Sequence, residues 1–334
     1  MKISILGAGA FGFAMAKVIA ENQSKNEMFI FDVNLDYIKH IKKTRRHPIF
    51  HGQTKLPINV HPVDDIKLAI VDADLIVLAI PSKFLRVALQ DIKKLLKKGV
   101  VFINLAKGLE MKTNNRVSEI IKSELSELDI NYEICCLSGG MIAREVTLEN
   151  PLCAELACEN KEVAKKIAKL LWSDYLRIET TDDLVGVELA GAFKNTIAIG
   201  AGIFDGLGYG ESSKSAFVSA CAKEMRGLAI AMGAKQVTYG PGSQAWFGDL
   251  MTTCFGKSRN RELGELIGKG VDVKAATDSM VKNNKSIEGY ITTEVVHNLL
   301  KEYKIIAPLL NDIHNVLYKD KKSRDFVTHF IKAW

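Results

Sequence analysis

The six cysteines of this 334-residue sequence form no CxxC pair, and no histidine lies near them at the spacing of a metal site. This absence argues against a zinc site and against a thioredoxin-like redox motif, so we expect no bound metal. Reduced thiols are typical of cytoplasmic proteins. The sequence also lacks low-complexity segments and internal repeats. We therefore expect an ordinary globular protein in the cytoplasm.

A strong charge of one sign is absent as well. The 45 basic and 39 acidic residues are spread along the chain and leave a net charge of +6. The densest basic run, at positions 42–46, is typical of a solvated helix end. This mild excess suits an anionic small molecule, and we expect no nucleic-acid partner.

Every long apolar run contains charged residues. The longest one, Leu184 to Phe204, carries Glu188 and Lys194 in its middle, and each would be costly at the centre of a bilayer. We interpret this run as a buried helix and expect no membrane insertion.

Strand patterns occupy the first part of the chain and are then absent. Up to about Asp182, short apolar runs rich in β-branched residues alternate with amphipathic stretches, which predicts a parallel sheet wound with helices. The predicted strands are Lys2–Leu6, Met28–Phe31, Leu75–Ile80, Val100–Leu105, Glu133–Leu137, Leu152–Leu156 and Leu176–Glu179. The helices predicted between them are Leu85–Lys98, Arg116–Ser126 and Lys161–Trp172.

The rest of the chain shows only helical patterns. The predicted helices are Leu184–Phe204, Ser213–Met232, Arg259–Ile267, Asp272–Met280, Ile291–Glu302 and Pro308–Tyr318. The predicted fold class is therefore α/β: a Rossmann-type doubly wound sheet over residues 1–182, followed by an all-helical domain over residues 183–334.

The opening run MKISILGAGAFGFAMAKVIA has the composition of a secretory signal peptide, but it also contains GxGxxG between a strand and a helix. In that motif Gly7 allows a tight turn, Gly9 lets the backbone approach a pyrophosphate, and Gly12 lets helix pack closely on strand. The motif calls for a carboxylate about 20 residues later, and Asp32 follows the next predicted strand. A carboxylate there accepts hydrogen bonds from the ribose of NAD and repels the 2′-phosphate of NADP, so we expect NAD.

Histidine, the usual acid or base in hydride-transfer enzymes, is absent between residues 62 and 296. A lysine is the alternative. Lys194 shares a helix face with small and apolar residues, so burial would lower its pKa toward neutrality. From this helix alone, a lysine that reaches out to solvent fits as well.

Two strand ends offer further candidates. Lys107 follows the Val100 strand, and Pro81 ends the Leu75 strand, at the edge of a parallel sheet where ligands bind. A solvated loop lysine is the simpler interpretation of Lys107.

A predicted helix start, at Ser258, places Arg259 and Asn260 in the first turn. Backbone amides plus a guanidinium suit a phosphate. A plain basic helix start would explain Arg261 equally well.

The motifs GAGAFG, AIPS, AKGLE, LSGG…AREV, VELAGAFKN, GDL…TC and SRNR, in this order, resemble the bacterial type of NAD(P)-dependent glycerol-3-phosphate dehydrogenase. The resemblance implies reversible reduction of dihydroxyacetone phosphate to sn-glycerol 3-phosphate for phospholipid synthesis. It implies that Lys194 is the proton donor and acceptor, that Lys107 contacts cofactor and substrate, and that Asp249 lies near the substrate hydroxyls. The other implied substrate contacts are Gly139, Ser258, Arg259 and Asn260. The cofactor contacts expected from motif and resemblance together are Gly7, Gly9, Ala10, Phe11, Gly12, Asp32, Pro81, Lys107, Ala143, Arg259 and Glu288.

Two positions depart from the pattern of this family. Met141 lies where a hydroxyl side chain is usual, and Trp246 replaces a small residue before GDL, so both bear on substrate identity. Another small phosphorylated or carboxylated ketone, or a non-catalytic NAD-binding sensor, are the alternatives. The apolar content of the helical domain suggests a homodimer.

Overall fold

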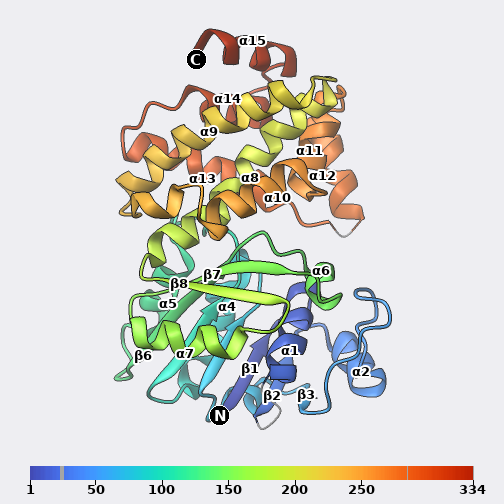
Figure 1. Ribbon diagram of the computed structural model, residues 1–334, viewed down its shortest axis with the longest axis vertical. Coiled ribbons are helices and arrows are strands. Elements are labelled where there is room, and N and C mark those ends of the chain that lie inside the picture. The colour runs from blue at the N-terminus through green and yellow to red at the C-terminus, as the bar shows by residue number, and fades with distance from the viewer. Residues whose placement is uncertain (23–25, 284, 334) are drawn as a thin grey trace. The chain divides into compact units, whose positions relative to one another are not determined.

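The computed structural model describes residues 1–22, 26–283 and 285–333 (Figure 1). Its contacts divide the chain into two compact units. The first contains Met1–Ala106 and Asn115–Val187, and the second contains Lys107–Asn114 and Glu188–Trp334. The short segment that carries Lys107 therefore groups with the helical unit, although strands of the first unit lie on both sides of it in sequence.

The first unit is built on one eight-stranded sheet in the order β3-β2-β1-β4-β5-β6-β7-β8. The strands are β1 (Lys2–Leu6), β2 (Glu27–Phe31), β3 (Val60–Pro62), β4 (Leu75–Leu78), β5 (Val100–Asn104), β6 (Tyr132–Ser138), β7 (Leu152–Cys158) and β8 (Leu176–Thr181). Strand order reverses beside β1, which pairs in parallel with both β2 and β4. This is the switch point at which open α/β sheets bind ligands.

The helices of this unit form two groups. The first group is α1 (Ala10–Asn22), α6 (Ala143–Thr147) and α7 (Lys161–Leu171), with α1 packed against the other two and against β1. The second is α3 (Ile66–Ile70), α4 (Ser82–Ile92) and α5 (Val117–Leu125). A further helix, α2 (Leu35–Thr44), packs near β3. The predicted Rossmann-type sheet is thus confirmed.

Two features of the sheet differ from the prediction. An eighth strand, β3, was missed because three residues that include Pro62 carry no periodic signal. The pairing of β6 with β7 is antiparallel, whereas the pattern predicted a parallel sheet. The connection between these strands contains only the five-residue α6, too short a helix for the usual crossover that returns a chain in the parallel direction.

One helix end was also predicted wrongly. The pattern predicted a helix over Leu85–Lys98, but α4 ends at Ile92 and continues as the 3₁₀ turn η1 (Lys93–Leu95). Lys97 instead pairs with Asp74, so its cation serves the sheet edge rather than a helix end.

The second unit is helical and is built around α8 (Leu184–Gly206). Its other elements are α9 (Glu211–Ala231), η2 (Gln236–Tyr239), η3 (Gln244–Gly248), α10 (Asp249–Phe255), α11 (Arg259–Gly268), α12 (Val273–Lys282), α13 (Glu288–Glu302), α14 (Pro308–Tyr318) and α15 (Ser323–Ala333). Of these, η2, η3, α10 and α15 were not predicted. By length and composition α8 could cross a membrane, but 94% of its most apolar window is buried, as expected of a core helix.

Glycines bring α8 and α11 into backbone contact. A Cβ atom at Gly202 would lie 2.0 Å from the carbonyl oxygen of Arg261, and one at Gly264 would lie 1.9 Å from that of Ile199. No side chain fits at either position. This close approach fixes the N-terminus of α11 relative to the part of α8 that carries Lys194.

Candidate functional site

The glycine-rich turn after β1 has the geometry that a dinucleotide requires. Gly7 has φ +104°, a region that side chains disfavour. A Cβ at Gly12 would lie 1.9 Å from the Gly7 carbonyl oxygen, so helix and turn touch there. Around Gly9 there is nothing within 4 Å of such a Cβ. The open space at Gly9, next to the first turn of α1, fits a pyrophosphate.

Asp32 lies directly after β2 and faces this turn. Its Oδ2 accepts a hydrogen bond from the Ala8 amide at 2.6 Å, and its Oδ1 accepts one from the Asn34 amide at 2.8 Å. Two backbone donors therefore fix the carboxylate, while its remaining lone pairs can still accept hydrogen bonds. This is the arrangement expected for binding the two ribose hydroxyls of NAD.

The other predicted residues of the first unit lie just after strands. Pro81 follows β4 and is the N-cap residue of α4. Gly139 follows β6, and Ala143 is the first residue of α6. Phe11 lies in the first turn of α1. Because β1, β4 and β6 run in the same direction through β5, Gly7, Pro81 and Gly139 lie at the same edge of the sheet.

A buried cluster of charge lies in the second unit. Lys194 on α8 is 6% exposed and donates hydrogen bonds to Asp249 Oδ1 and, at 2.8 Å, to Thr253 Oγ1. Lys107 Nζ binds the other oxygen of the same carboxylate at 2.7 Å. One aspartate, itself 2% exposed, thus bridges two lysines. Lys194 does not reach solvent, which decides between the two interpretations of its helix.

The electrostatics of this cluster perturb the proton affinity of Lys194. Burial lowers the pKa of Lys194 to about 8, because an ammonium loses its hydration there. The Asp249 carboxylate raises this pKa and the Lys107 cation lowers it again, so the two charges partly cancel. With two cations and one anion the cluster carries net positive charge, which favours an anionic ligand.

Thr253 was not predicted from the sequence. It lies one turn after Asp249 on α10, so both side chains project from the same helix face. The Thr253 hydroxyl donates to the Asp249 carbonyl oxygen at 2.6 Å, and its lone pairs are therefore left to accept from Lys194. The four-residue spacing would have indicated Thr253 if α10 had been predicted.

A chain of amides connects this cluster with the start of α11. Asn195 Nδ2 donates to the Lys107 carbonyl oxygen at 3.3 Å, and Asn195 Oδ1 accepts from Asn260 Nδ2 at 2.9 Å. Asn260 Oδ1 in turn accepts from the Gly289 amide at 3.0 Å. The side chain of Asn260 is therefore engaged within the protein. Asn195 and Gly289 were missed by sequence reasoning.

The two arginines at the start of α11 have different surroundings. Ser258 caps the helix, as predicted, by accepting from the Arg261 amide. Arg261 binds Asp205 at 2.6 Å and the Gly256 carbonyl oxygen at 2.9 Å, so it is a structural residue. Arg259 is exposed and contacts Ser286 at 2.8 Å. Arg259 is thus the arginine of this pair whose side chain is exposed.

Comparisons with known proteins fit this arrangement. Models of the NAD-dependent glycerol-3-phosphate dehydrogenase N-terminus and C-terminus match residues 2–164 and 183–328. The chain belongs to this family. It is 36% identical over 328 residues to glycerol-3-phosphate dehydrogenase [NAD(P)+] of Staphylococcus haemolyticus, covering 98% of this chain and 96% of the relative. The corresponding enzyme of Clostridium botulinum is 36% identical over 326 residues, covering 96% and 95%. The crystal structure of the Coxiella burnetii glycerol-3-phosphate dehydrogenase superposes with a TM-score of 0.90 at 29% identity, covering 99% of this chain and 98% of that one.

Membership in the glycerol-3-phosphate dehydrogenase family confirms the resemblance noted in the sequence. The protein is an oxidoreductase, and NAD is its cofactor. The glycine turn and Asp32 fit that cofactor. Glu288, the first residue of α13, adjoins Gly289 in the amide chain, and its charge raises the pKa of Lys194.

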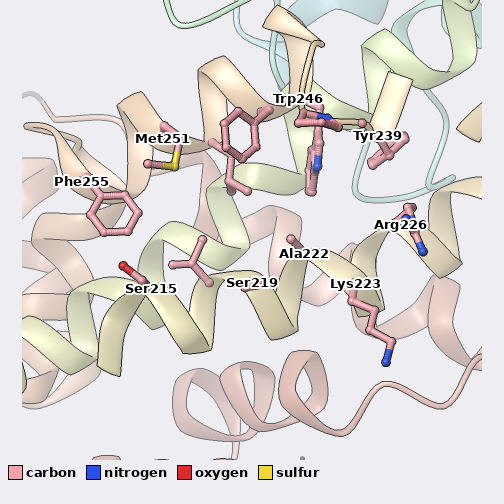
Figure 2. A pocket seen from close by; sticks show the side chains of 14 residues that line it. Ser215, Ser219, Ala222, Lys223, Arg226, Tyr239, Trp246, Met251 and Phe255 are labelled. Carbon is pink, nitrogen blue, oxygen red and sulfur yellow. The ribbon is translucent and has the colours of Figure 1, made fainter. Parts of the chain in front are cut away.

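Neither departure from the family pattern lies in the lysine cluster. Met141 is 7% exposed and packs in the hydrophobic core of the first unit. Trp246 is 3% exposed and packs on Tyr239, with ring centroids 4.7 Å apart. Trp246 lines a groove between α9 and α10, together with Met251 and Phe255 (Figure 2), and the volume of this groove is about 490 Å³. Among the described residues that line this groove there is none of the predicted site residues.

Proposed function

We propose that this protein reversibly reduces dihydroxyacetone phosphate to sn-glycerol 3-phosphate with NADH, and that Lys194 exchanges the proton. The observation that carries the proposal is the buried Lys194, whose pKa is lowered to about 8. An acid or base is most effective when its pKa lies near the working pH. As an ammonium, Lys194 gives a proton to the carbonyl oxygen during reduction. As an amine, it accepts that proton back during oxidation.

Asp249 and Lys107 prepare this group for its task. Asp249 holds the Lys194 ammonium through one oxygen and Lys107 through the other, so all three side chains have fixed positions. Thr253 supplies a further acceptor for Lys194. The second cation, Lys107, polarises the substrate carbonyl and stabilises the negative charge that develops on its oxygen. The carboxylate thus serves as a positioning group between two cations.

The substrate phosphate is expected at the start of α11. The N–H groups of the first turn have no partners within their own helix, and the helix dipole favours an anion at this end. Ser258 caps the helix, Arg259 contributes its guanidinium, and Asn260 contributes its backbone N–H. Gly139, after β6, is proposed as a backbone contact to the substrate.

The first unit is proposed to hold the cofactor. The proposed cofactor contacts are Gly7, Gly9, Ala10, Phe11, Gly12, Asp32, Pro81, Lys107, Ala143, Arg259 and Glu288. When bound, NADH supplies the hydride that reduces the carbonyl carbon. Because Asp32 repels a 2′-phosphate, NAD is preferred over NADP. We accordingly propose residues 1–182 as the dinucleotide-binding domain and residues 183–334 as the substrate domain.

The proposed setting is a cytoplasmic homodimer that supplies phospholipid synthesis. Six free cysteines support a reducing compartment. Phe247 and Met251, which are 44% and 41% exposed on the groove of Figure 2, support association, since apolar patches of this kind often mark interfaces. Light scattering on the purified protein measures the number of chains directly.

The activity is tested by the loss of NADH absorbance when dihydroxyacetone phosphate is added, with NADPH and other keto acids in parallel. We expect turnover with NADH and this ketone. Lys194→Ala should abolish turnover with little effect on NADH binding. A Lys194→Ala variant with near-normal turnover would overturn the assignment of the proton donor. Turnover with a different ketone alone would overturn the substrate.

A further inference from the structure

A buried histidine, His47, stabilises the turn before Gly52. His47 is 4% exposed, and its Nδ1 accepts hydrogen bonds from the amides of Ile49 and Phe50, each at 3.0 Å. An acceptor nitrogen requires the neutral ring. Burial lowers the pKa of His47 to about 4, so this ring stays neutral at physiological pH. The His47 ring thereby fixes the turn that presents the next histidine, His51.

His51 contacts two helices at once. Its Nε2 lies 2.7 Å from the carbonyl oxygen of Ala10, the first residue of α1. Its ring stacks on Phe13 of the same helix, with centroids 5.4 Å apart and planes at 16°. Its Nδ1 lies 3.2 Å from Thr147 Oγ1, the last residue of α6. His51 therefore joins the first turn of α1 to α6.

The backbone of His51 supports a specific role. Its φ is +66°, a conformation that costs free energy for a residue with a side chain and persists where surrounding contacts impose it. Burial lowers the pKa of His51, which favours the neutral ring. Because a carbonyl oxygen only accepts, Nε2 must carry the proton and donate to Ala10.

The second contact of the ring is weaker than the first. With Nε2 protonated, Nδ1 accepts, and the Thr147 hydroxyl is the donor. That hydroxyl also lies 2.9 Å from the carbonyl oxygen of Arg144, so two acceptors compete for one proton. The hydrogen bond from His51 Nε2 to the Ala10 carbonyl oxygen is therefore the stronger of the two hydrogen bonds of this ring.

We propose that His51 is a positioning residue for cofactor binding. This inference rests on the proposed function, in which Ala10 and Phe11 on α1 and Ala143 on α6 contact the dinucleotide. By holding the Ala10 carbonyl and stacking on Phe13, His51 fixes the direction in which the first N–H groups of α1 point. It also sets the distance between α1 and α6. Its removal would weaken NADH binding and leave the proton transfer at Lys194 unchanged.

Two isosteric substitutions separate this role from a general structural one. In His51→Gln the amide nitrogen can occupy the place of Nε2 and donate to Ala10. In His51→Asn it occupies the place of Nδ1 and cannot reach Ala10. Asparagine tolerates a positive φ better than glutamine does. Backbone strain therefore favours the Asn variant, whereas the proposed hydrogen bond favours the Gln variant.

The test is titration of each purified variant with NADH, followed by intrinsic fluorescence, together with thermal unfolding and kcat at saturating NADH. We expect His51→Asn to bind NADH about two- to tenfold more weakly, the value of one hydrogen bond. His51→Gln should stay within about twofold of the unchanged protein, and kcat should be similar in both. His40→Gln, an exposed histidine on α2, is the matched control and should change nothing.

The outcomes distinguish this proposal from the one on which it rests. If His51→Asn folds and binds NADH as tightly as the unchanged protein, the role of His51 is refuted while the proposed function stands. The same holds if His51→Gln folds and binds as weakly as His51→Asn. If the unchanged protein binds no NADH, both proposals fall. Should His51→Gln not fold, the comparison of His51→Asn with the unchanged protein still decides.

Discussion

Neutralising Asp249 is the sharpest perturbation of the proposed proton donor. The substitution Asp249→Asn keeps the shape of the side chain and removes the charge that lies between Lys194 and Lys107. Burial lowers the pKa of Lys194 to about 8, and Asp249 is the main influence that raises it. A neighbouring opposite charge changes a pKa by about one to three pH units. We therefore expect the pKa of Lys194 to fall by about that amount in the variant.

The consequence for the reaction has a definite sign. Reduction needs the ammonium form of Lys194, so kcat/KM for dihydroxyacetone phosphate decreases as pH rises through its pKa. In the unchanged protein roughly nine-tenths of Lys194 is protonated at pH 7, given a pKa of about 8. A pKa that is about one to three pH units lower leaves half or less protonated at that pH. Oxidation needs the amine form, so kcat/KM for oxidation increases as pH rises through the pKa of Lys194. In the variant this increase should occur at lower pH as well.

The assay is the pH profile of kcat/KM in both directions, which reports the groups of the free enzyme. Asp205→Asn is a matched control: Asp205 binds Lys214 at 2.8 Å and Arg261 at 2.6 Å in the same unit, away from the lysine cluster. The Asp205→Asn variant should be less stable, but its kcat/KM for reduction should still decrease near pH 8. If the Asp249→Asn variant folds and its kcat/KM for reduction decreases at the same pH as in the unchanged protein, or at a higher pH, the assignment of Lys194 as the titrating group is refuted.

Two further predictions concern stability and the cofactor turn. Because the pKa of Lys194 falls from 10.5 to about 8 on folding, the unfolded chain binds more protons between these values, and stability should rise with pH across that window. Across this window the difference corresponds to about 3 kcal/mol. Lys194→Met removes the titrating group and should abolish this rise with pH. Chemical denaturation on both sides of the window measures the rise, and a Lys194→Met variant that keeps it would contradict the prediction. Gly9→Ala should keep the fold and weaken NADH binding, whereas Gly12→Ala should lose about 2 kcal/mol or more, since its Cβ meets the Gly7 carbonyl. Thermal unfolding and NADH titration separate the two effects, and the reverse pattern would disprove the roles given to these glycines.

The fold was predictable where burial leaves a local pattern. The buried strand β4 reads as an unbroken apolar run, because both faces of a central parallel strand are covered. The direction of β7 was not predictable, because an antiparallel and a parallel strand have the same apolar character. The seven-residue α10 was missed as well, since a helix of two turns gives little periodic signal. Its omission mattered because α10 carries Asp249 and Thr253.

The candidate site residues could be named from the sequence one by one, but their contacts with one another could not. Lys194, Lys107 and Asp249 were named from their motifs, yet nothing local to any of them indicates that one carboxylate joins both lysines. Asn195 is 88 residues from Lys107 in sequence, and its link to the Lys107 carbonyl exists only in the folded chain. Such partners leave no periodic trace. The sequence therefore identifies candidate residues but does not show which of them contact one another.

The packing of α8 explains how the fold can keep a lysine in its core. A buried ammonium destabilises a protein unless partners hold it, and here those partners come from α10 and from the segment of Lys107. The glycine contacts between α8 and α11 set the position of α8 independently of that charge. The lysine can then titrate without the helix moving, because backbone contacts rather than the ion pair hold the helix. In the proposed mechanism Lys194 changes its charge in every turnover, and these backbone contacts would keep α8 in place while it does so.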